Sequence, residues 1–366
     1  MKIWIDAKNA ASQNAGIAKW SEYQLSLNDQ AFNSKLSLIY PSKSKFEPYA
    51  NLNIKRKKLF AFNRFPSIFS TFLYDLFIFR FFAKFGKPDL IFSPYYDVLM
   101  PKGIPSIISI HDLCYVEQPV LYSKLRRSYF LWVMKMNAKR SSLIITVSQT
   151  SKNQISNYLD IPKSKIVVLP NVIDKEFNSY QPSRIEIERF RSNYVNFRRI
   201  ILYTGGFENR KNIPMLLSAI KEINTGGFNI ALVVTGLGSE KWKSAIAKEN
   251  LDRKYLSFLG SLTNQELKIA YKSVDAVVYP SLSEGFGRSC IEAIACETPL
   301  ICSDIPVFRE VAGDYPLYFD PKDLQSLVAT INQALTNTKL PKIQGTPQME
   351  LSVKLQDVME DVINGN

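Results

Sequence analysis

An apolar strand, a glycine turn and a helix follow one another between residues 275 and 296. Residues 275–280 are mostly apolar, which is typical of a buried parallel strand, and residues 291–296 are predicted to be a helix. Gly285 and Gly287 lie in the turn, where the missing Cβ lets the backbone approach a ligand closely. Because free N–H groups at a helix start bind phosphate or hydroxyl groups, the segment predicts an α/β fold with a ligand site at this turn.

Two carboxylates bracket the turn. Glu284 lies on the loop and Glu292 follows in the helix, so the pair is placed to contact two separate hydroxyl clusters of one ligand. Either glutamate alone is typical of an ordinary surface turn, and only the combination indicates a site. The backbone N–H groups that we expect to face the ligand are those of Phe286, Gly287, Arg288 and Ser289.

The sequence Glu-Gly-Phe-Gly at residues 284–287, with seven residues between Glu284 and Glu292, resembles the signature of the retaining GT-B glycosyltransferases of family 4, or glycosyl transferases group 1. Residues 295–306 and 308–313 continue the likeness, which is to the type that assembles bacterial polysaccharides. Residues 165–174 resemble the family's interdomain segment, with Val172 in place of the usual glycine. The resemblance implies two Rossmann-like domains with doubly wound parallel sheets that face a central cleft.

The length of 366 residues suits two domains, and strand–helix alternation runs through both halves. We expect an N-terminal acceptor-binding domain over residues 1–178 and a C-terminal nucleotide-sugar-binding domain over residues 179–347. The resemblance implies that residues 348–366 form a helix that returns to the N-terminal domain. Ser148 is a predicted N-cap. The predicted buried strands also include residues 2–5, 35–40, 88–92, 105–110, 143–147, 199–204 and 230–235.

The resemblance also implies roles for individual residues. Arg210 and Lys211, two adjacent cations at a predicted strand–turn–helix junction, bind the donor diphosphate. Glu284 holds the hydroxyls of the transferred sugar and Glu292 holds the ribose. Two glycine-loop positions complete the donor site in this interpretation: Gly16 faces the diphosphate, and Leu262 borders the nucleobase through its backbone.

His111 is the only histidine of the chain and follows a predicted parallel strand. The carboxyl ends of such strands line the crevice where α/β folds bind ligands. In the resembled family a histidine at this place contacts the transferred sugar or the reaction centre. We therefore interpret His111 and Glu284 as catalytic residues.

The implied reaction transfers a hexosyl group from a UDP- or GDP-linked donor to a glycan hydroxyl with retention. Metal-dependent sugar transferases of the other common fold hold their ion with Asp-x-Asp, which this chain lacks, so we expect no metal or other cofactor. The leaving diphosphate is then stabilised by Arg210, Lys211 and the helix start at Arg288 and Ser289. The sequence does not distinguish donors such as UDP-glucose and GDP-mannose.

Other functions stay open on the sequence alone. An epimerase or a phosphorylase can share the fold, and a non-catalytic sugar-nucleotide-binding subunit is a further possibility. The presence of both glutamates together with Arg210 and Lys211 argues against a decayed site. Nucleic-acid binding would depend on the isoelectric point of about 9.4 alone, and stacking motifs are missing.

Charge and aromatic content predict where the protein works. Residues 1–180 hold 25 Lys and Arg and 12 Asp and Glu, whereas the remaining residues hold 21 of each, so the net charge of +13 lies in the first half. Four basic residues at 55–58 precede the phenylalanine-rich residues 59–82. A packed helix and a solvated basic face would explain both features. We nevertheless expect a peripheral protein on the anionic inner face of the plasma membrane, where a lipid-linked glycan is the acceptor of exopolysaccharide synthesis.

Two further observations indicate a cytoplasmic protein. The four cysteines form no Cys-x-x-Cys pair, which favours free thiols in a reducing compartment. A strand begins directly after Met1, and the most apolar region carries Asp75 and Arg80, so neither a signal peptide nor a membrane span is predicted.

Overall fold

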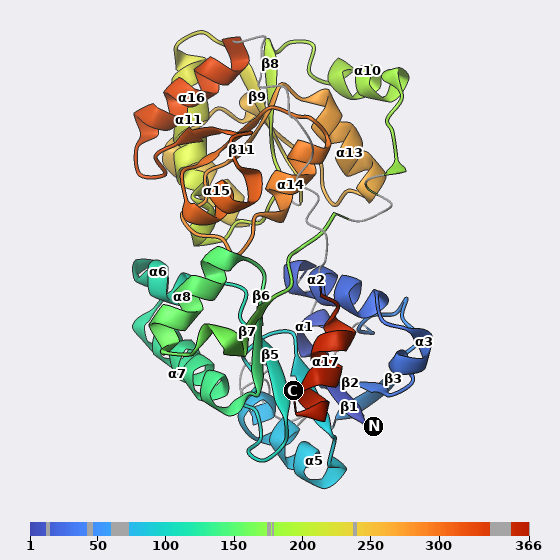
Figure 1. Cartoon of the computed structure of the whole chain (residues 1–366). Helices are drawn as coiled ribbons and strands as arrows, with labels where there is room; N and C mark the ends of the chain where they lie inside the picture. Colours follow the sequence, from blue (N-terminus) through green and yellow to red (C-terminus); the bar gives the residue numbers. More distant parts are fainter. Residues whose placement is uncertain are drawn as a thin grey trace. The chain divides into compact units, whose positions relative to one another are not determined.

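The computed structural model describes residues 1–11, 15–41, 47–59, 73–173, 177, 179–236, 240–336 and 353–365 (Figure 1). The chain divides into two compact units. Unit 1 comprises Met1–Asn171 together with Glu350–Asn366, and unit 2 comprises Val172–Met349. The sequence analysis placed the corresponding boundaries after residues 178 and 347.

Unit 1 is built on one parallel sheet with the strand order β3-β2-β1-β4-β5-β6-β7. Its strands are short and almost wholly buried except at β3, as expected when helices cover both faces of a parallel sheet. The strands are β1 (Ile3–Asp6), β2 (Leu36–Pro41), β3 (Lys55–Leu59), β4 (Leu90–Ser93), β5 (Ser106–Ser109), β6 (Leu143–Thr146) and β7 (Ile166–Val168).

The helices of unit 1 connect these strands and bury their apolar sides. Its described helices are α1 (Lys8–Ala11), α2 (Ala15–Ser26), α3 (Gln30–Asn33), the π-helical η1 (Tyr74–Ile78), α5 (Phe79–Gly86), α6 (Cys114–Glu117), η2 (Pro119–Leu121), α7 (Lys124–Arg140), α8 (Gln149–Leu159), η3 (Lys163–Lys165) and α17 (Leu355–Asn364). Residues of α5, α7 and α8 share one hydrophobic cluster with the strands. Ser148 caps α8 by accepting a hydrogen bond from the Ser151 N–H, as predicted.

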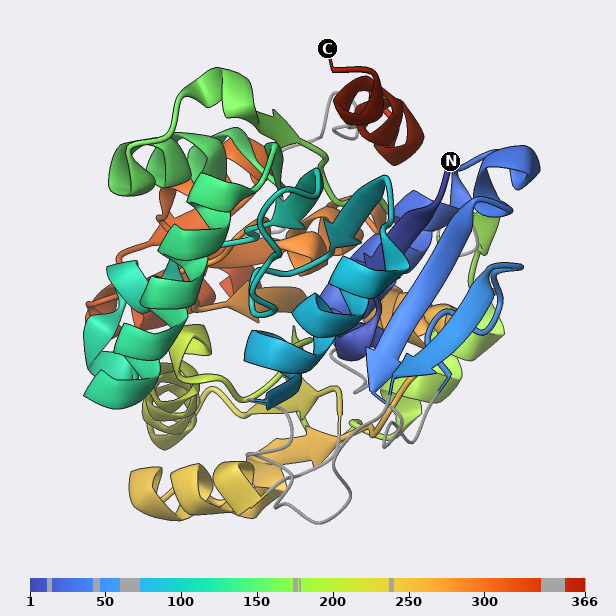
Figure 2. The same ribbon diagram turned by 90° about the horizontal axis from the view of Figure 1, so that it is seen from below.

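The last helix, α17, lies against α2 in unit 1. The Gln356 side chain accepts a hydrogen bond from the Asp29 N–H at 3.0 Å. Leu355 and Met359 are fully buried. Figure 2 shows α17 beside the N-terminal elements, and the polypeptide therefore enters unit 1 twice.

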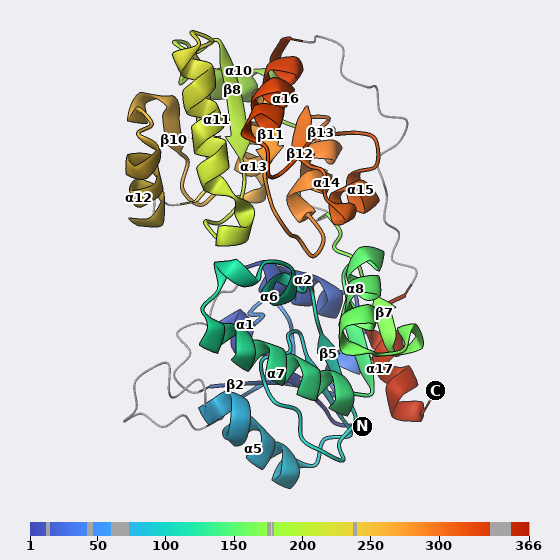
Figure 3. The same cartoon turned by 90° about the vertical axis from the view of Figure 1, so that its left-hand side faces the viewer.

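Unit 2 has a six-stranded parallel sheet with the order β10-β9-β8-β11-β12-β13. Its strands are β8 (Arg199–Tyr203), β9 (Ile230–Val234), β10 (Leu256–Phe258), β11 (Ala276–Tyr279), β12 (Leu300–Ser303) and β13 (Leu317–Phe319). The described helices are α10 (Arg184–Ser192), η4 (Asn209–Lys211), α11 (Ile213–Thr225), α12 (Glu240–Glu249), η5 (Arg253–Tyr255), α13 (Asn264–Ser273), α14 (Arg288–Ala295), α15 (Pro306–Ala312) and α16 (Leu324–Thr336). Helices α11 and α16 lie side by side (Figure 3).

The basic cluster at residues 55–58 forms the edge strand β3, which the sequence analysis did not predict because its residues are almost all charged. Lysines on an edge strand oppose pairing with another chain. The Arg56 guanidinium donates hydrogen bonds to the carbonyls of Tyr49 (2.6 Å) and Leu52 (2.9 Å) and so fixes the preceding loop.

The phenylalanine-rich region is only partly described, because residues 60–72, with the predicted helix start at Pro66, lie outside the described residues. The helical part ends at Gly86 and packs against Trp4 so closely that a Cβ on Gly86 would lie 2.3 Å from the indole. Phe79 is buried, as the packed-helix interpretation requires. Phe77, Phe81 and Phe85 are instead 58%, 59% and 69% exposed.

A buried group of charges lies where the chain of unit 1 changes direction across its sheet, between β1 and β4. Lys8 forms ion pairs with Asp75 of η1 and, at 2.6 Å, with Asp97. Asp6 at the end of β1 accepts a hydrogen bond from Ser93 at the end of β4. Three carboxyls thus surround one ammonium. Burial, opposed by Lys8 and supported by the charge of Asp97, raises the pKa of Asp75 to about 8.

We predict a pH-dependent stability difference for Asp75→Asn. A carboxyl whose pKa rises from 3.8 to about 8 on folding binds more protons in the folded than in the unfolded chain. The wild type therefore loses free energy of unfolding as the pH rises from about 4 to about 8, and Asp75→Asn lacks this loss. Urea unfolding across that interval measures the effect, with the exposed Asp314→Asn as control. Parallel curves for wild type and Asp75→Asn would contradict it.

Candidate functional site

Unit 2 has a topological switch point between β8 and β11. From β8 the chain builds the sheet in one direction through β9 and β10, and it then returns to add β11, β12 and β13 on the other side. Open α/β sheets bind ligands outside the carboxyl ends of the strands at such a point. The loops after β8 and β11 meet there, where the Leu282 N–H donates to the Arg210 carbonyl at 2.8 Å.

Glu284 joins the two loops electrostatically. Its carboxylate accepts hydrogen bonds from Arg210 (2.6 Å), Lys211 (2.5 Å) and the Ser281 hydroxyl (2.8 Å). Burial alone would raise the pKa of Glu284, but the two cations and their hydrogen bonds outweigh burial and lower it to about 2. The structure brings together the cations predicted to bind diphosphate and the carboxylate predicted to bind the sugar, and here they bind one another.

Glu292 lies in α14 and is 7% exposed. The Arg288 Nε donates to its carboxylate at 2.9 Å and the Tyr271 hydroxyl donates at 3.1 Å. The Tyr271 hydroxyl also bonds to Tyr279 (2.9 Å) and Thr204 (2.9 Å), so that groups from β8, α13 and β11 form one buried network with Glu292. This network fixes the orientation of the carboxylate.

Gly287 is required by the fold itself as well as by any ligand. Its φ of 90° is in the left-handed region, and a Cβ there would lie 2.7 Å from the Phe308 ring. Phe286 is 3% exposed, so its side chain belongs to the core of unit 2. Helix α14 begins at Arg288, three residues before the predicted start. Ser289 lies in its first turn, and its hydroxyl donates to the Thr204 carbonyl at 3.4 Å.

His111 belongs to unit 1, where it follows the carboxyl end of β5. Its Nε2 lies 2.9 Å from the Pro94 carbonyl, and Trp20 contacts the ring edge-on. Burial lowers the pKa of His111 below its usual 6.5. Because a carbonyl only accepts hydrogen bonds, Nε2 carries the proton of the neutral ring and Nδ1 is the acceptor.

The remaining predicted residues lie at element ends. Gly16 is in the first turn of α2 in unit 1, and nothing described lies within 4 Å of a Cβ built there. Leu262 lies between β10 and α13 in unit 2. The structure therefore collects Arg210, Lys211, Glu284 and the α14 residues in unit 2, whereas Gly16 and His111 belong to unit 1.

Sequence reasoning missed the hydroxyl groups that orient the two glutamates: Ser281, Thr204, Tyr271 and Tyr279. Three of them, Ser281, Thr204 and Tyr279, lie at or just beyond the carboxyl ends of β8 and β11. Because ligands bind at this edge of the sheet, their position in the sequence could have identified them as site residues. Tyr271 gives no such signal, because an apolar helix position explains it equally well. Among the described residues no group of three potential ligands is placed to hold a metal ion, and all four cysteines are buried free thiols.

Two family models match the chain. "Glycosyltransferase Family 4" matches residues 33–177 and "Glycosyl transferases group 1" matches residues 184–346. The chain belongs to the family 4 glycosyltransferases. Together with the two parallel sheets, this agrees with the fold and the family that the sequence motifs predicted.

Among curated relatives of this glycosyltransferase chain is the O-antigen chain mannosyltransferase RfbU of Salmonella typhimurium, 31% identical over 256 residues. That match covers 69% of this chain and 66% of the relative. The O-antigen chain mannosyltransferase B of Escherichia coli is 26% identical, with 63% and 61% covered. The chain thus spans slightly less than two thirds of the length of these relatives.

Solved structures show the GT-B fold. Anabaena HepE in complex with UDP and glucose superposes with a TM-score of 0.70 at 18% identity, over 92% of this chain and 90% of that one. WaaG, a glycosyltransferase of lipopolysaccharide biosynthesis, gives a TM-score of 0.68 at 12% identity over 92% and 91%. The predicted architecture of two Rossmann-like units is confirmed.

We predict opposite stability effects for two glycine replacements in this glycosyltransferase. Gly287→Ala forces a Cβ into Phe308 at a positive φ, so it should lower the free energy of unfolding by about 1–3 kcal/mol. Gly16→Ala adds a methyl group to open space in a helix and should raise it by about 0.4–1 kcal/mol. Urea unfolding of both variants measures these changes in the free energy of unfolding. An equal change in the two variants would contradict the predicted difference between the two sites.

Proposed function

We propose that the protein transfers a hexosyl group, with retention, from a UDP- or GDP-linked sugar to a hydroxyl of a growing glycan. The family assignment and the O-antigen mannosyltransferases among its relatives support a role in polysaccharide assembly. The observation that carries the proposal is the Arg210–Lys211–Glu284 cluster at the switch point of unit 2. The acceptor in this proposal is lipid-linked, and the protein works at a membrane surface.

Arg210 and Lys211 bind the donor diphosphate in this mechanism. The cluster carries two positive charges and one negative charge, so a net positive charge remains for the phosphates, and α14 begins beside it. As the bond from the anomeric carbon to the phosphate oxygen breaks, negative charge grows on the leaving diphosphate. Cations fixed in advance stabilise that charge without reorganisation. Because these cations supply the stabilisation, we propose that no divalent metal is needed.

Glu284 has two tasks in this proposal. Three donors occupy its oxygens, and a carboxylate has about four lone-pair positions. One position is left for a hydroxyl of the transferred sugar. The carboxylate thereby orients both cations and the sugar, while Glu292, held by Arg288 and Tyr271, binds the ribose.

The chemistry of the transfer needs no protein base. The acceptor oxygen forms its bond to the anomeric carbon on the face that the diphosphate leaves, and the acceptor proton passes to a diphosphate oxygen. No enzyme nucleophile is needed for retention by this route. The neutral His111, with Nδ1 as an acceptor, would receive a hydrogen bond from a sugar hydroxyl.

The test of the function is product formation. The protein is incubated with UDP- and GDP-sugars, with and without a lipid-linked glycan extract, and with and without EDTA. Retaining transfer that requires acceptor and tolerates EDTA is expected. Donor conversion without acceptor would favour an epimerase, and donor binding without any turnover would favour a non-catalytic subunit.

We predict that Lys211→Ala weakens binding of the nucleoside diphosphate by roughly 10- to 100-fold, as expected for a lost charge-assisted hydrogen bond of about 1.5–3 kcal/mol. Isothermal titration calorimetry measures the dissociation constant for the nucleoside diphosphate. The control is Lys243→Ala in α12, a lysine of the same unit that forms an ion pair with the exposed Glu240. Equal nucleotide affinity of Lys211→Ala and Lys243→Ala would show that Lys211 does not bind the diphosphate.

We predict that Tyr271→Phe weakens nucleotide binding without removing a group that touches the ligand. The Tyr271 hydroxyl donates to Glu292, and its loss frees the carboxylate to turn. The dissociation constant for the nucleoside diphosphate should rise roughly 3- to 10-fold, while kcat at saturating donor stays within a factor of about two. The control is Tyr315→Phe, which removes a hydroxyl that donates to the Thr298 carbonyl between α14 and β12. A fall in kcat alone would contradict a positioning role.

A further inference from the structure

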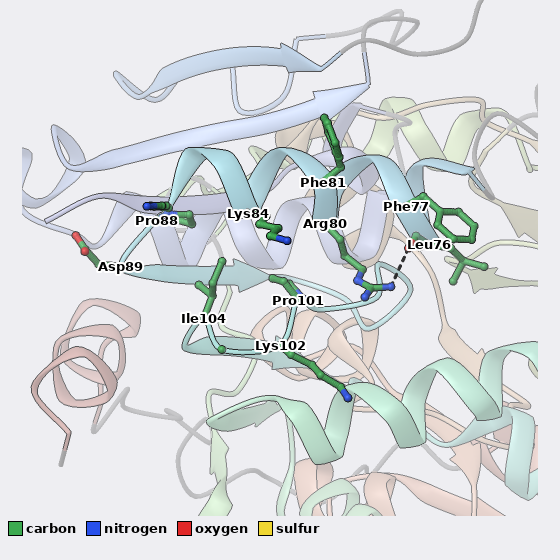
Figure 4. A pocket seen from close by; sticks show the side chains of 12 residues that line it. Leu76, Phe77, Arg80, Phe81, Lys84, Pro88, Asp89, Pro101, Lys102 and Ile104 are labelled. Atoms are coloured by element: carbon green, nitrogen blue, oxygen red, sulfur yellow. Dashed lines mark hydrogen bonds between the residues drawn. The ribbon is translucent and has the colours of Figure 1, made fainter.

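A cavity of about 830 Å³ lies along α5 in unit 1 (Figure 4). It extends from Leu76 and Phe77 of η1 to the residues just before β4 and to residues 101–104 just before β5. It therefore reaches the amino-terminal ends of these strands, whereas His111 and Ser93 lie at their carboxyl ends. The cavity is separate from the crevice in which a parallel sheet binds its substrate.

The lining of the cavity is strongly cationic. Arg80, Lys84, Lys87 and Lys102 contribute four positive charges, and none of them forms an ion pair within the described part of the chain. Asp89 is the one carboxylate of the lining, and it accepts a hydrogen bond from the Lys2 N–H and lies near the terminal amino group. An excess of positive charge in a concave site favours an anionic occupant.

Arg80 in the lining and Arg140, which contacts the segment before Pro101, form no ion pair among the described residues. Arg80 donates to the Leu76 carbonyl at 3.3 Å, and Arg140 of α7 donates to the Met100 carbonyl at 3.1 Å. The Nε of each is buried without a hydrogen-bond partner among the described residues. Burial and the charge of Arg80 both lower the pKa of Arg140. Two half-buried guanidinium groups that repel one another, each with a buried Nε that has no partner among the described residues, fit a site for a phosphate group.

An aromatic stripe lies next to these cations. Phe77, Phe81 and Phe85 follow one another at intervals of four residues, so they share one side of the helix. Each is more than half exposed, and the rings of Phe81 and Phe85 are 4.8 Å apart. Phe77 and Phe81 also line the cavity together with Arg80 and Lys84 (Figure 4). Three exposed phenylalanines in one stripe indicate an interaction surface.

The edge strand β3 adds lysines on the same side of the sheet. Residues in register in neighbouring strands share a face, and alternate residues of a strand share one too. Trp4, Ile39 and Leu59 all belong to the cluster that α5 covers. Lys57 is in register with Ile39, and its Nζ lies 5.6 Å from the centre of the Trp4 ring, so Lys55 and Lys57 lie on the α5 side. Lys58 lies over Tyr40 on the opposite face.

We propose that this face of unit 1, formed by the phenylalanine stripe, the arginine–lysine cavity and Lys55 and Lys57, docks on an anionic membrane. The phenylalanine rings enter the boundary between headgroups and acyl chains, and the cavity holds a lipid phosphate. A soluble anion would use the cations but would leave the aromatic stripe exposed. A second copy of the same face would bring like charges together. The inference deepens the proposed function, on which its biological meaning depends, by naming the membrane partner of unit 1.

The experiment is flotation of the full-length protein with vesicles of phosphatidylcholine alone or mixed with phosphatidylglycerol. The wild type should float only with the anionic vesicles, and added salt should reduce the bound fraction. Lys84→Gln with Lys102→Gln should lower the partition coefficient roughly 30-fold, since each basic residue at an anionic surface contributes about 1 kcal/mol. Phe81→Gln with Phe85→Gln should lower it by a factor that does not change with salt.

The matched control is Lys58→Gln with Lys243→Gln, which removes the same charge from other faces and should lower the partition much less. If the control lowers flotation as much as Lys84→Gln with Lys102→Gln, the named surface is wrong. Absence of flotation at low salt overturns the proposal. Binding of glycerol phosphate without flotation would mean a soluble ligand, and loss of a dimer in the Phe81/Phe85 variant by light scattering would mean a second copy. Either result overturns membrane docking.

Failure of this inference and failure of the proposed function are distinguishable. Nucleoside diphosphate binding, measured without vesicles, depends on unit 2 and should be unchanged in all of the flotation variants. Loss of flotation with intact nucleotide binding identifies the docking surface. If the protein floats but neither binds nucleotide nor turns over any donor, the docking surface is supported and the proposed glycosyl transfer is contradicted.

Discussion

A carboxylate buried between two cations determines the geometry of unit 2. Glu284 binds Arg210 and Lys211, and these residues come from loops that follow two neighbouring strands of the sheet. The attraction therefore holds the end of β8 and the end of β11 in one arrangement, with the Leu282–Arg210 backbone hydrogen bond as a second tie. A buried ion pair of this kind is favourable only when its remaining hydrogen bonds are made, and here Ser281 supplies one of them.

Unit 1 has the same strand order as unit 2 through its first six strands. It also buries charged groups at its switch point, but the ratio of cations to carboxyls is different. In unit 2 two cations meet one carboxylate. In unit 1 one lysine meets three carboxyls, and burial raises the pKa of Asp75 to about 8. Under the proposed function, the excess of cations in unit 2 suits the anionic diphosphate of the donor.

Many of the strands, turns and candidate site residues could be predicted from the sequence, because local sequence patterns determine them. The apolar run before the Gly285–Gly287 turn is β11, and Arg210 and Lys211 directly follow β8 on η4. Contacts between distant segments could not be predicted. The pairing of Glu284 with the cations depends on the adjacency of β8 and β11, and β3 forms although its residues have little strand propensity. Gly287 was interpreted through ligand approach alone, whereas Phe308 also requires it.

The position of α17 has a consequence for the order in which the protein folds. Helix α17 of unit 1 follows all of unit 2 in the chain and is therefore synthesised after it. Until α17 arrives, its partner α2 lacks the helix that packs against it, and Leu355 and Met359 of α17 are not yet buried. During translation unit 2 can complete its own core first, and unit 1 waits for Leu355–Asn364 to leave the ribosome. Helix α17 thus couples completion of unit 1 to the synthesis of unit 2.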